Sequence, residues 1–433
     1  MQISHLKNTS RCINLIFLLI CSFLIVLNYF LVMIDFQNGQ KLIVFIFLIL
    51  IPFVFFLNIK NYEELPTKFL IALLIIISLS EKTFDWDALN IWFFHAKRIY
   101  VSGNFFEQMN NYFPSAHNDY PTILPSLQVS VNRYFIDLNY SDKAVLYPKE
   151  IFSARIASQA NLMFIIFPLI FIISFLKGFY KKMFFVIFFL FITEKVLLSG
   201  SVDNILGLYF VSLFLCIYKY FFTKNDLEKK LYLFTSILLI IILTLLKNEG
   251  LVLFLSLYFA LCVSLFLLKL DVSIKKILLL LVATLPILFW KYMCIKNNIG
   301  SDLINKDLFN NFQRNFFNLR NHWLIFNGIF LNKSIILPLA IYFCIFFTNT
   351  DLNEKGNYFG IKLKKINKKI YLFSFLSIFV YLLTIYFVYL ISPHSMDWHV
   401  STSAYRIVLP VGLLLITVSL MANQDSKKDS SFK

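Results

Sequence analysis

Two aspartates on either side of a tryptophan, Asp85 and Asp87 in the stretch EKTFDWDALNIW, have the residue type and placement for acid–base chemistry. They follow an apolar run, where a carboxylate is partly desolvated and can still meet a substrate, which suits a general base. Helical periodicity in ALNIWFFHAKRIY predicts an interfacial helix over residues 88–100, so the aspartates could instead cap that helix. The two interpretations are compatible for a pair of residues.

A second polar stretch, HNDYP, holds His117, Asp119 and Tyr120 and runs directly into the apolar segment 122–136. The proline after this turn sets the first turn of a helix, which we expect to be interfacial or re-entrant. Two titratable groups two residues apart are suited to binding a sugar hydroxyl or a phosphate. The alternative is that His117 is an ordinary loop histidine.

Three charged residues stand at the ends of later apolar runs. Asp203 follows the sequence SGSV, and an isolated aspartate at such a position is more often an N-cap than a catalyst. Lys247 and Glu249, in LLKNEGL, interrupt the apolar stretch 231–269 at a predicted membrane boundary, where charges usually have a function. Lys247 could neutralise a lipid-linked phosphate and Glu249 could position that phosphate or a sugar. The alternative is a snorkelling lysine and a solvated glutamate.

The stretch SPHSMDWHVSTSAYR precedes the last apolar run and contains His399 and Arg406. Arg406 is predicted to lie inside the membrane helix, where an arginine is costly unless it is paired or binds an anion. It is therefore predicted either to bind a phosphate or to form a salt bridge with one of the carboxylates. Glu194 and Lys195 lie within the apolar run 183–200. They either neutralise each other or border the cavity that holds the candidate site residues.

The composition excludes a soluble globular domain. Hydrophobic residues make up 59% of the 433 residues, the mean hydropathy is +0.73 and 52 residues are phenylalanine, which is too much apolar surface for one soluble core. The net charge of +16 lies in short clusters between apolar runs, so no nucleic-acid partner is expected. The six cysteines lack metal-ligand spacing, so we predict no disulfide framework and assign no metal ligand.

Hydropathy predicts an all-α polytopic membrane protein with about twelve transmembrane helices in a single membrane domain, 1–433. The spans are expected at 12–34, 41–58, 67–80, 154–176, 183–200, 203–222, 231–247, 250–269, 276–294, 334–348, 370–391 and 405–421. Two long segments, 81–153 and 295–333, are too polar to span and are expected outside the cytoplasm. The first is expected to carry interfacial helices and the functional site.

Lysine clusters set the expected orientation, because cytoplasmic loops of membrane proteins are enriched in basic residues. With both termini in the cytoplasm, the following lysines all fall on the inner side: Lys177, Lys181, Lys182, Lys224, Lys229, Lys230, Lys275, Lys276, Lys362, Lys364, Lys365, Lys368, Lys369, Lys427 and Lys428. The short outer connections at 35–40, 200–202, 248–249 and 392–404 contain no Lys or Arg. The candidate site residues are then predicted on one side, facing the periplasm or the exterior.

The stretches WDALNIWFFHAK, HNDYPTILP, LLKNEGL and WHVSTSAYR look like short blocks that recur in a bacterial branch of the GT-C superfamily of integral membrane glycosyltransferases. In layout the chain is similar to the protein mannosyltransferases that use dolichyl-phosphate mannose and to the aminoarabinose transferases. These enzymes have an early outer loop with an acidic motif and interfacial helices, followed by many spans. The similar stretches lie between residues 81 and 410.

The resemblance implies transfer of a sugar, with inversion, from a polyprenyl-phosphate donor to a glycan, lipid or protein acceptor at the outer face of the bacterial cytoplasmic membrane. Asp87 is the match for the acidic residue that acts as base or orients the acceptor, although Trp86 separates two aspartates that adjoin in many relatives. The departing phosphate would meet Lys247 and Arg406. No cofactor is assigned, and a divalent cation is left open because some relatives work without one.

Two other functions stand as alternatives. A polysaccharide polymerase or ligase also uses lipid-linked glycans and usually relies on Arg and His in a later outer loop, where this chain has Arg314, Arg320 and His322. A flippase for lipid-linked glycans would need a polar path through the spans, which contain few charges. A purely structural membrane protein would not explain candidate charges gathered on one side.

Overall fold

The computed structural model describes residues 2–56, 62–80, 84–107, 109–110, 112–113, 116–139, 152–193, 201–223, 225–267, 274–300, 307–350 and 368–422. This part of the chain contains helices and no β-strand. The elements are α1 (Gln2–Met33), α2 (Gln37–Phe56), the 3-10 helix η1 (Tyr62–Glu64), α3 (Leu65–Ser80), the π-helix η2 (Ala88–Trp92), α4 (Phe93–Ser102), α5 (Ile123–Asn139), α6 (Ala154–Ser174), α7 (Phe179–Thr193), α8 (Asp203–Phe222), α9 (Asp226–Leu246), α10 (Asn248–Leu267), α11 (Ile274–Val282), α12 (Leu285–Lys296), α13 (Leu308–Phe316), α14 (Leu319–Phe330), α15 (Lys333–Thr350), α16 (Lys368–Ile391), α17 (Met396–Ile407) and α18 (Leu409–Ala422).

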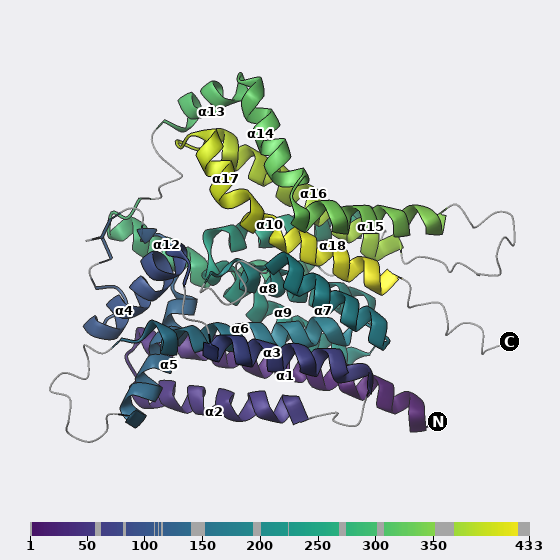
Figure 1. The fold of residues 1–433 in the computed structure, drawn as a ribbon, viewed down its shortest axis with the longest axis horizontal. Coiled ribbons are helices and arrows are strands. Elements are labelled where there is room, and N and C mark those ends of the chain that lie inside the picture. The colour runs from purple at the N-terminus through teal and green to yellow at the C-terminus, as the bar shows by residue number, and fades with distance from the viewer. Residues whose placement is uncertain are drawn as a thin grey trace, which may run out of the picture.

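The long helices lie side by side in a bundle, with α4, α12 and α17 at one end and the start of α1 at the other (Figure 1). At the α1 end, the Lys181 ammonium donates to the Leu420 carbonyl near the end of α18 (2.9 Å), and Lys182 pairs with Glu64. Several lysines of the predicted inner clusters lie at helix ends on this side, among them Lys177, Lys181, Lys182, Lys229 and Lys369. Six other lysines of these clusters lie outside the described residues: Lys224, Lys362, Lys364, Lys365, Lys427 and Lys428.

Nine helices of the described chain are long and apolar enough to cross a membrane, and the pair α14 and α15, bent by 68°, would make a tenth. This confirms the all-α polytopic membrane class. The predicted count of about twelve is higher because two predicted spans correspond to shorter helices, and a full crossing takes roughly 20 residues. α3 has 16 residues and α7 has 15, while residues 194–200 lie outside the described chain.

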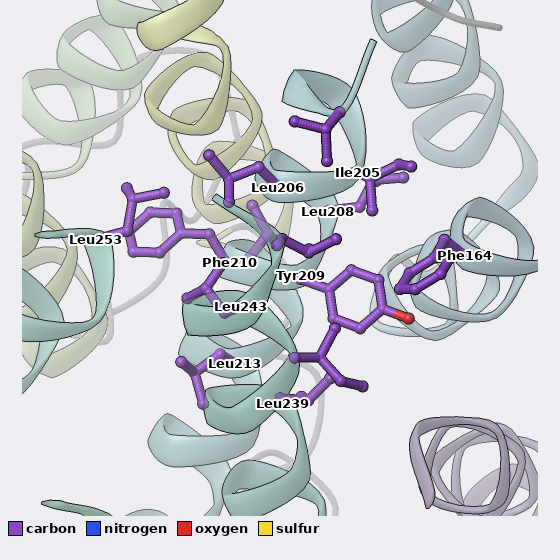
Figure 2. Close-up of a cluster of buried hydrophobic side chains, with 14 of the residues drawn as sticks. Phe164, Ile205, Leu206, Leu208, Tyr209, Phe210, Leu213, Leu239, Leu243 and Leu253 are labelled. Carbon is purple, nitrogen blue, oxygen red and sulfur yellow. The ribbon is translucent and has the colours of Figure 1, made fainter. Parts of the chain in front are cut away.

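α8 is the central helix of the bundle and packs against α6, α9, α10 and α18. It is apolar around its whole circumference, so nearly all its side chains are buried, as in a helix enclosed by other helices. Figure 2 shows Tyr209 of α8 in this core with Phe164 of α6, Leu243 of α9 and Leu253 of α10. This packing fixes the position of Asp203, the first residue of α8.

α5, which the sequence predicts as an interfacial or re-entrant helix, is buried among α1, α2, α4 and α6. The Arg133 guanidinium donates to Asp35 Oδ1 (2.8 Å) and to Gln40 Oε1 (2.9 Å). Ser130 Oγ donates to Asn28 Oδ1 (2.7 Å). These pairings offset the cost of burying polar groups, so the polar side of α5 packs inward instead of facing solvent.

Candidate functional site

Five charged side chains from distant parts of the chain meet at the end of the bundle opposite the start of α1. Asp87 precedes η2, Asp203 begins α8, Lys247 and Glu249 flank the corner between α9 and α10, and Arg406 lies in α17. We call these five residues the Lys247 cluster. They are linked by four ion pairs, and the sequence singled out each of them as a site residue.

Lys247 lies at the centre of the cluster and is buried, with 5% of its surface exposed. Its Nζ is 3.0 Å from Asp203 Oδ1 and 3.1 Å from Glu249 Oε1. Burial alone would lower the pKa of the lysine, but the two carboxylates outweigh it and raise the pKa above its ordinary value. The alternative of a snorkelling lysine is therefore wrong, and Lys247 is a fixed positive charge inside the protein.

The corner that carries Lys247 depends on a close approach of two helices. Lys247 has an extended backbone and ends α9, while α10 begins at the next residue. A Cβ atom on Gly250 would lie 1.8 Å from the Leu243 carbonyl oxygen. Only glycine fits there, and this close contact holds the corner at which Lys247 reaches both Asp203 and Glu249.

Asp203 does not cap α8. Its carboxylate accepts hydrogen bonds from Lys247 Nζ and from Ser201 Oγ (2.8 Å), and its Oδ2 is 3.9 Å from an Arg406 nitrogen. The side chain is 3% exposed. Asp203 therefore serves as the buried counter-ion for two cations, so the alternative of a simple N-cap is wrong.

Arg406 forms a salt bridge with Asp87, one of the two outcomes expected from the sequence. Asp87 has helical backbone angles and its side chain makes no capping hydrogen bond, so its carboxylate is directed to Arg406 instead of to the helix start. Both side chains keep partial exposure, 21% for Asp87 and 18% for Arg406. Within the cluster, this pair is more accessible than the Lys247–Asp203 pair.

Two polar atoms of the cluster are buried without a hydrogen-bond partner among the described residues, Glu249 Oε2 and Arg406 Nε. Buried polar atoms in native proteins nearly always find a partner, in protein, water or ligand. One is an acceptor and the other a donor. The cluster therefore has unused bonding capacity of both kinds.

A second ion pair adjoins the cluster through Asn248. Asp119 Oδ2 accepts a hydrogen bond from Asn248 Nδ2 (2.7 Å), and Lys291 Nζ of α12 donates to Asn248 Oδ1 (2.7 Å) and lies 3.6 Å from Asp119 Oδ2. Trp290 Nε1 donates to the Asp119 carbonyl (3.0 Å). We call this the Asp119–Lys291 pair. Lys291 was not predicted as a site residue, although its place near the end of the apolar run 276–294 was a signal.

An aromatic stack connects the HNDYP turn to the cluster. The ring of Tyr120 stacks on His117 (centroids 4.6 Å apart) and on Trp92 (5.7 Å). Lys247 Nζ lies 5.9 Å from the centre of the Tyr120 ring. His117 has a positive φ of 48°, which is uncommon for a residue with a side chain. The three predicted residues of this turn thus lie beside the cluster.

Asp85 and His399 lie outside the ion pairs of the cluster. Asp85 is half-buried, and its carbonyl accepts the hydrogen bond of the Leu89 N–H (3.2 Å) at the start of η2. His399 is buried in α17 with its ring edge-on to Tyr389, 4.8 Å between centroids. Asp87 is therefore the aspartate of the pair that enters the cluster.

The residues behind the polymerase alternative have contacts of their own. Arg320 pairs with Asp397 (3.0 Å), where both side chains are exposed, and the ring of His322 contacts the Tyr386 hydroxyl (2.5 Å). Arg320 and His322 both lie on α14, in the predicted outer segment 295–333. Glu194 and Lys195 fall outside the described residues.

α4 holds the loop that leads to the HNDYP turn. Arg98 donates to the carbonyls of Glu107 and Phe105, and the imidazole Nε2–H of His95 donates to the Ala116 carbonyl (2.9 Å). Both His95 and Arg98 are buried, because the loop folds over them. They position the turn that carries Asp119.

Burial of His95 predicts a stability that falls in mild acid. Burial, with the nearby Arg98 charge, lowers the pKa of His95 to about 4. Because the unfolded chain binds this proton near pH 6.5, stability is lost as the pH falls from that value toward 4, by about 2 kcal/mol between pH 7 and pH 5. Thermal unfolding at both pH values measures the loss. His95→Gln should remove this part of the pH dependence, and an unchanged dependence in that variant would contradict the prediction.

No three His, Cys, Asp or Glu side chains converge to hold a metal ion among the residues that the structure describes. Comparison of the chain with protein-family models, curated proteins and solved structures finds no match. The case for a function therefore rests on the Lys247 cluster and its neighbours.

Proposed function

We propose that this chain is a membrane glycosyltransferase that moves a sugar from a polyprenyl-phosphate donor to a hydroxyl acceptor, with inversion. The observation that carries the proposal is the Lys247 cluster together with the Asp119–Lys291 pair, three cations and four carboxylates at one end of a membrane bundle. A lipid-linked phosphate lies at the membrane boundary, and cations there stabilise the charge it carries as a leaving group. The sequence resemblance to the GT-C superfamily favours the same chemistry.

In the proposed reaction, the acceptor oxygen bonds to the anomeric carbon while the bond from that carbon to the phosphate oxygen breaks. The bonding electrons leave with the polyprenyl phosphate, and the acceptor proton passes to Asp87. Asp87 suits this role better than Asp203, because Asp203 is enclosed and bound by Lys247 and Ser201. Attack opposite the leaving phosphate inverts the anomeric carbon.

Arg406 links phosphate binding to the activation of Asp87. The Lys247 cluster has three carboxylates and two cations, so an incoming phosphate is favoured where it replaces a carboxylate beside a cation. At Arg406 this exchange releases Asp87 from its salt bridge. The Asp87 carboxylate is then free to take the acceptor proton once the donor is bound.

Lys291 is the second cation that we assign to the donor phosphate, in place of Lys247. Lys247 is enclosed by Asp203 and Glu249, whereas the Lys291 side chain is 36% exposed. Its two side-chain partners, Asn248 and Asp119, leave it accessible from one side. Lys247 would then organise the carboxylates and leave phosphate contact to Arg406 and Lys291.

Lys291→Met is expected to raise the KM for the polyprenyl-phosphate donor by roughly tenfold, since one charge-assisted contact of about 1.5 kcal/mol is lost. The kcat should change less, and Lys291→Arg should restore most of the affinity. Initial rates against donor concentration in detergent–lipid micelles provide the measurement. An unchanged donor KM in Lys291→Met would remove this lysine from the phosphate site.

The proposed setting is the bacterial cytoplasmic membrane, with both termini in the cytoplasm and the site on the periplasmic or exterior face. Lysines gather at the helix ends on the side of the bundle where α1 begins. They support this orientation, because basic residues are retained in the cytoplasm. In this arrangement the 81–153 segment is the first extracytoplasmic loop, with α4 as its helix near the interface, and 295–333 is the second.

The proposal is tested by offering the purified protein in lipid three radiolabelled donors: a polyprenyl-phosphate sugar, a polyprenyl-diphosphate glycan and a nucleotide sugar. Transfer from the polyprenyl-phosphate sugar to added acceptors supports the proposal. Transfer from the diphosphate-linked glycan alone would support the polymerase or ligase alternative. Movement of labelled lipid across the bilayer without any transfer would support a flippase.

A further inference from the structure

α13 and α14 form an arm that stands out from the bundle beside α17 (Figure 1). The arm packs on α16 and α17. Asparagine side chains of the arm face the protein: Asn315 Nδ2 donates to the carbonyls of Leu390 (3.0 Å) and Ser392 (3.3 Å), and Asn321 Nδ2 donates to Asn315 Oδ1 (3.2 Å). Asn311, Asn315 and Asn321 are all buried.

Six large apolar side chains of the same arm are exposed. Phe317 is 80% exposed and Leu319 is 83% exposed, and the others are Phe309, Phe316, Trp323 and Phe326. A helix with asparagines packed inward and aromatic side chains outward has the reverse of the arrangement that water favours. Contiguous exposed apolar surface of this kind marks a binding surface for lipid or protein.

The position and charge of the arm fit a lipid surface. α14 meets α15 at 68°, so if α15 follows the spans, α14 runs closer to the plane of the membrane than to its normal. Residues 308–350 include no Asp or Glu, while Arg314 and Arg320 of the arm are exposed, Arg320 in its exposed pair with Asp397 of α17. Aromatic and basic side chains on one element are typical of a helix at the headgroup level of an anionic bilayer.

The groove next to the arm continues this apolar face along the bundle. It has a volume of about 410 Å³ and is lined by side chains of α14, α15 and α16, among them Phe326, Phe330 and Phe379. The groove and the exposed aromatic side chains of α14 share Phe326. The exposed apolar side chains of the arm and the groove between α14, α15 and α16 therefore meet at Phe326.

We propose that the α13–α14 arm lies in the membrane interface and binds anionic phospholipid, with its aromatic side chains among the acyl chains and Arg314 and Arg320 at the headgroups. This role does not depend on the proposed glycosyltransferase activity. It also assigns a role to Arg314 and Arg320 of the 295–333 segment, which are not part of the Lys247 cluster.

The test compares the fluorescence of the wild type with that of Trp323→Phe in liposomes, so that the difference is the emission of Trp323. Brominated phospholipid should lower this difference by at least about twofold, and aqueous iodide should leave it nearly unchanged. Trp398→Phe is the matched control for removal of another exposed tryptophan. Quenching of Trp323 by iodide, or by neither agent, would overturn the proposal, and the latter result would indicate a protein neighbour.

The preference for anionic lipid is tested in the same assay. Brominated phosphatidylglycerol should quench Trp323 more strongly than brominated phosphatidylcholine, and the variant with both Arg314→Gln and Arg320→Gln should abolish the difference. Equal quenching by the two lipids in the wild type would overturn the anionic part of the proposal. Neither measurement requires transferase activity, so failure here and failure of the glycosyltransferase proposal are distinguishable.

Discussion

Asp87→Asn is expected to lower kcat for sugar transfer by roughly 10²- to 10⁴-fold, the range for loss of a general base. Asparagine keeps the shape of the side chain and can still contact Arg406, but it cannot accept the acceptor proton at neutral pH. The donor KM should fall or stay the same, because the Asp87 carboxylate then no longer competes with the phosphate for the Arg406 guanidinium. Steady-state transfer rates give both constants.

Asp85→Asn is the matched control, since it removes the neighbouring aspartate on the other side of Trp86 while leaving the Arg406 salt bridge intact. It should reduce kcat by far less than Asp87→Asn does. If the two variants lose equal activity, or Asp85→Asn loses more, the assignment of Asp87 as the base is incorrect. Size-exclusion profiles and thermal unfolding would show whether both variants remain folded.

Lys247→Met is expected to destabilise the protein by about 3–5 kcal/mol, the cost of removing one partner from a buried ion pair. The substitution leaves Asp203 enclosed without its main cation and Glu249 without its ion pair. Adding Asp203→Asn should recover part of the loss, because the uncompensated buried charge is then removed. Chemical or thermal unfolding in detergent measures these differences.

The matched control is Lys229→Met at the opposite end of the bundle. Lys229 pairs with Asp226 at 3.7 Å, and both side chains are exposed, so its loss should cost no more than about 1 kcal/mol. A Lys247→Met variant that is no less stable than Lys229→Met would show that Lys247 is not the fixed centre of the cluster. No recovery on addition of Asp203→Asn would contradict the proposed cause of the destabilisation.

Much of the architecture could be predicted because membrane helices leave a strong one-dimensional signal. An apolar run of about 20 residues is visible wherever it lies, so α6, α8 and α16 agree closely with the predicted spans. The signal also marks short helices such as α3, which has 16 residues, as membrane spans. It cannot distinguish a lipid-facing helix from an enclosed one. The inward polar side of α5 was missed because burial depends on neighbouring helices.

The candidate site could be predicted as a set of residues but not as a set of pairs. Charged residues at membrane boundaries are costly, so Lys247, Asp203 and Arg406 stood out individually. Their partners are distant in sequence: Arg406 and Asp87 are 319 positions apart, and Lys247 and Asp203 are 44 positions apart. Periodicity carries no information about such pairs. Lys291 was missed for a related reason, since its importance comes from Asp119 and Asn248 on other elements.

The pairing also changes the roles assigned from sequence. Lys247 was expected to bind the donor phosphate, but because of its two carboxylate partners we propose that it organises the cluster instead. Arg406 was expected either to bind phosphate or to form a salt bridge. The salt bridge is present, and exchange of Asp87 for phosphate lets the proposed reaction use both.

The most direct test of the account is product analysis of a single reaction, in which purified protein in lipid receives one polyprenyl-phosphate sugar of known anomeric configuration and an acceptor. NMR of the product and quantification of the released polyprenyl phosphate are carried out on the same sample. We expect an inverted anomeric centre and one polyprenyl phosphate released for each sugar transferred. Retention of configuration, or sugar transfer without release of polyprenyl phosphate, would contradict it.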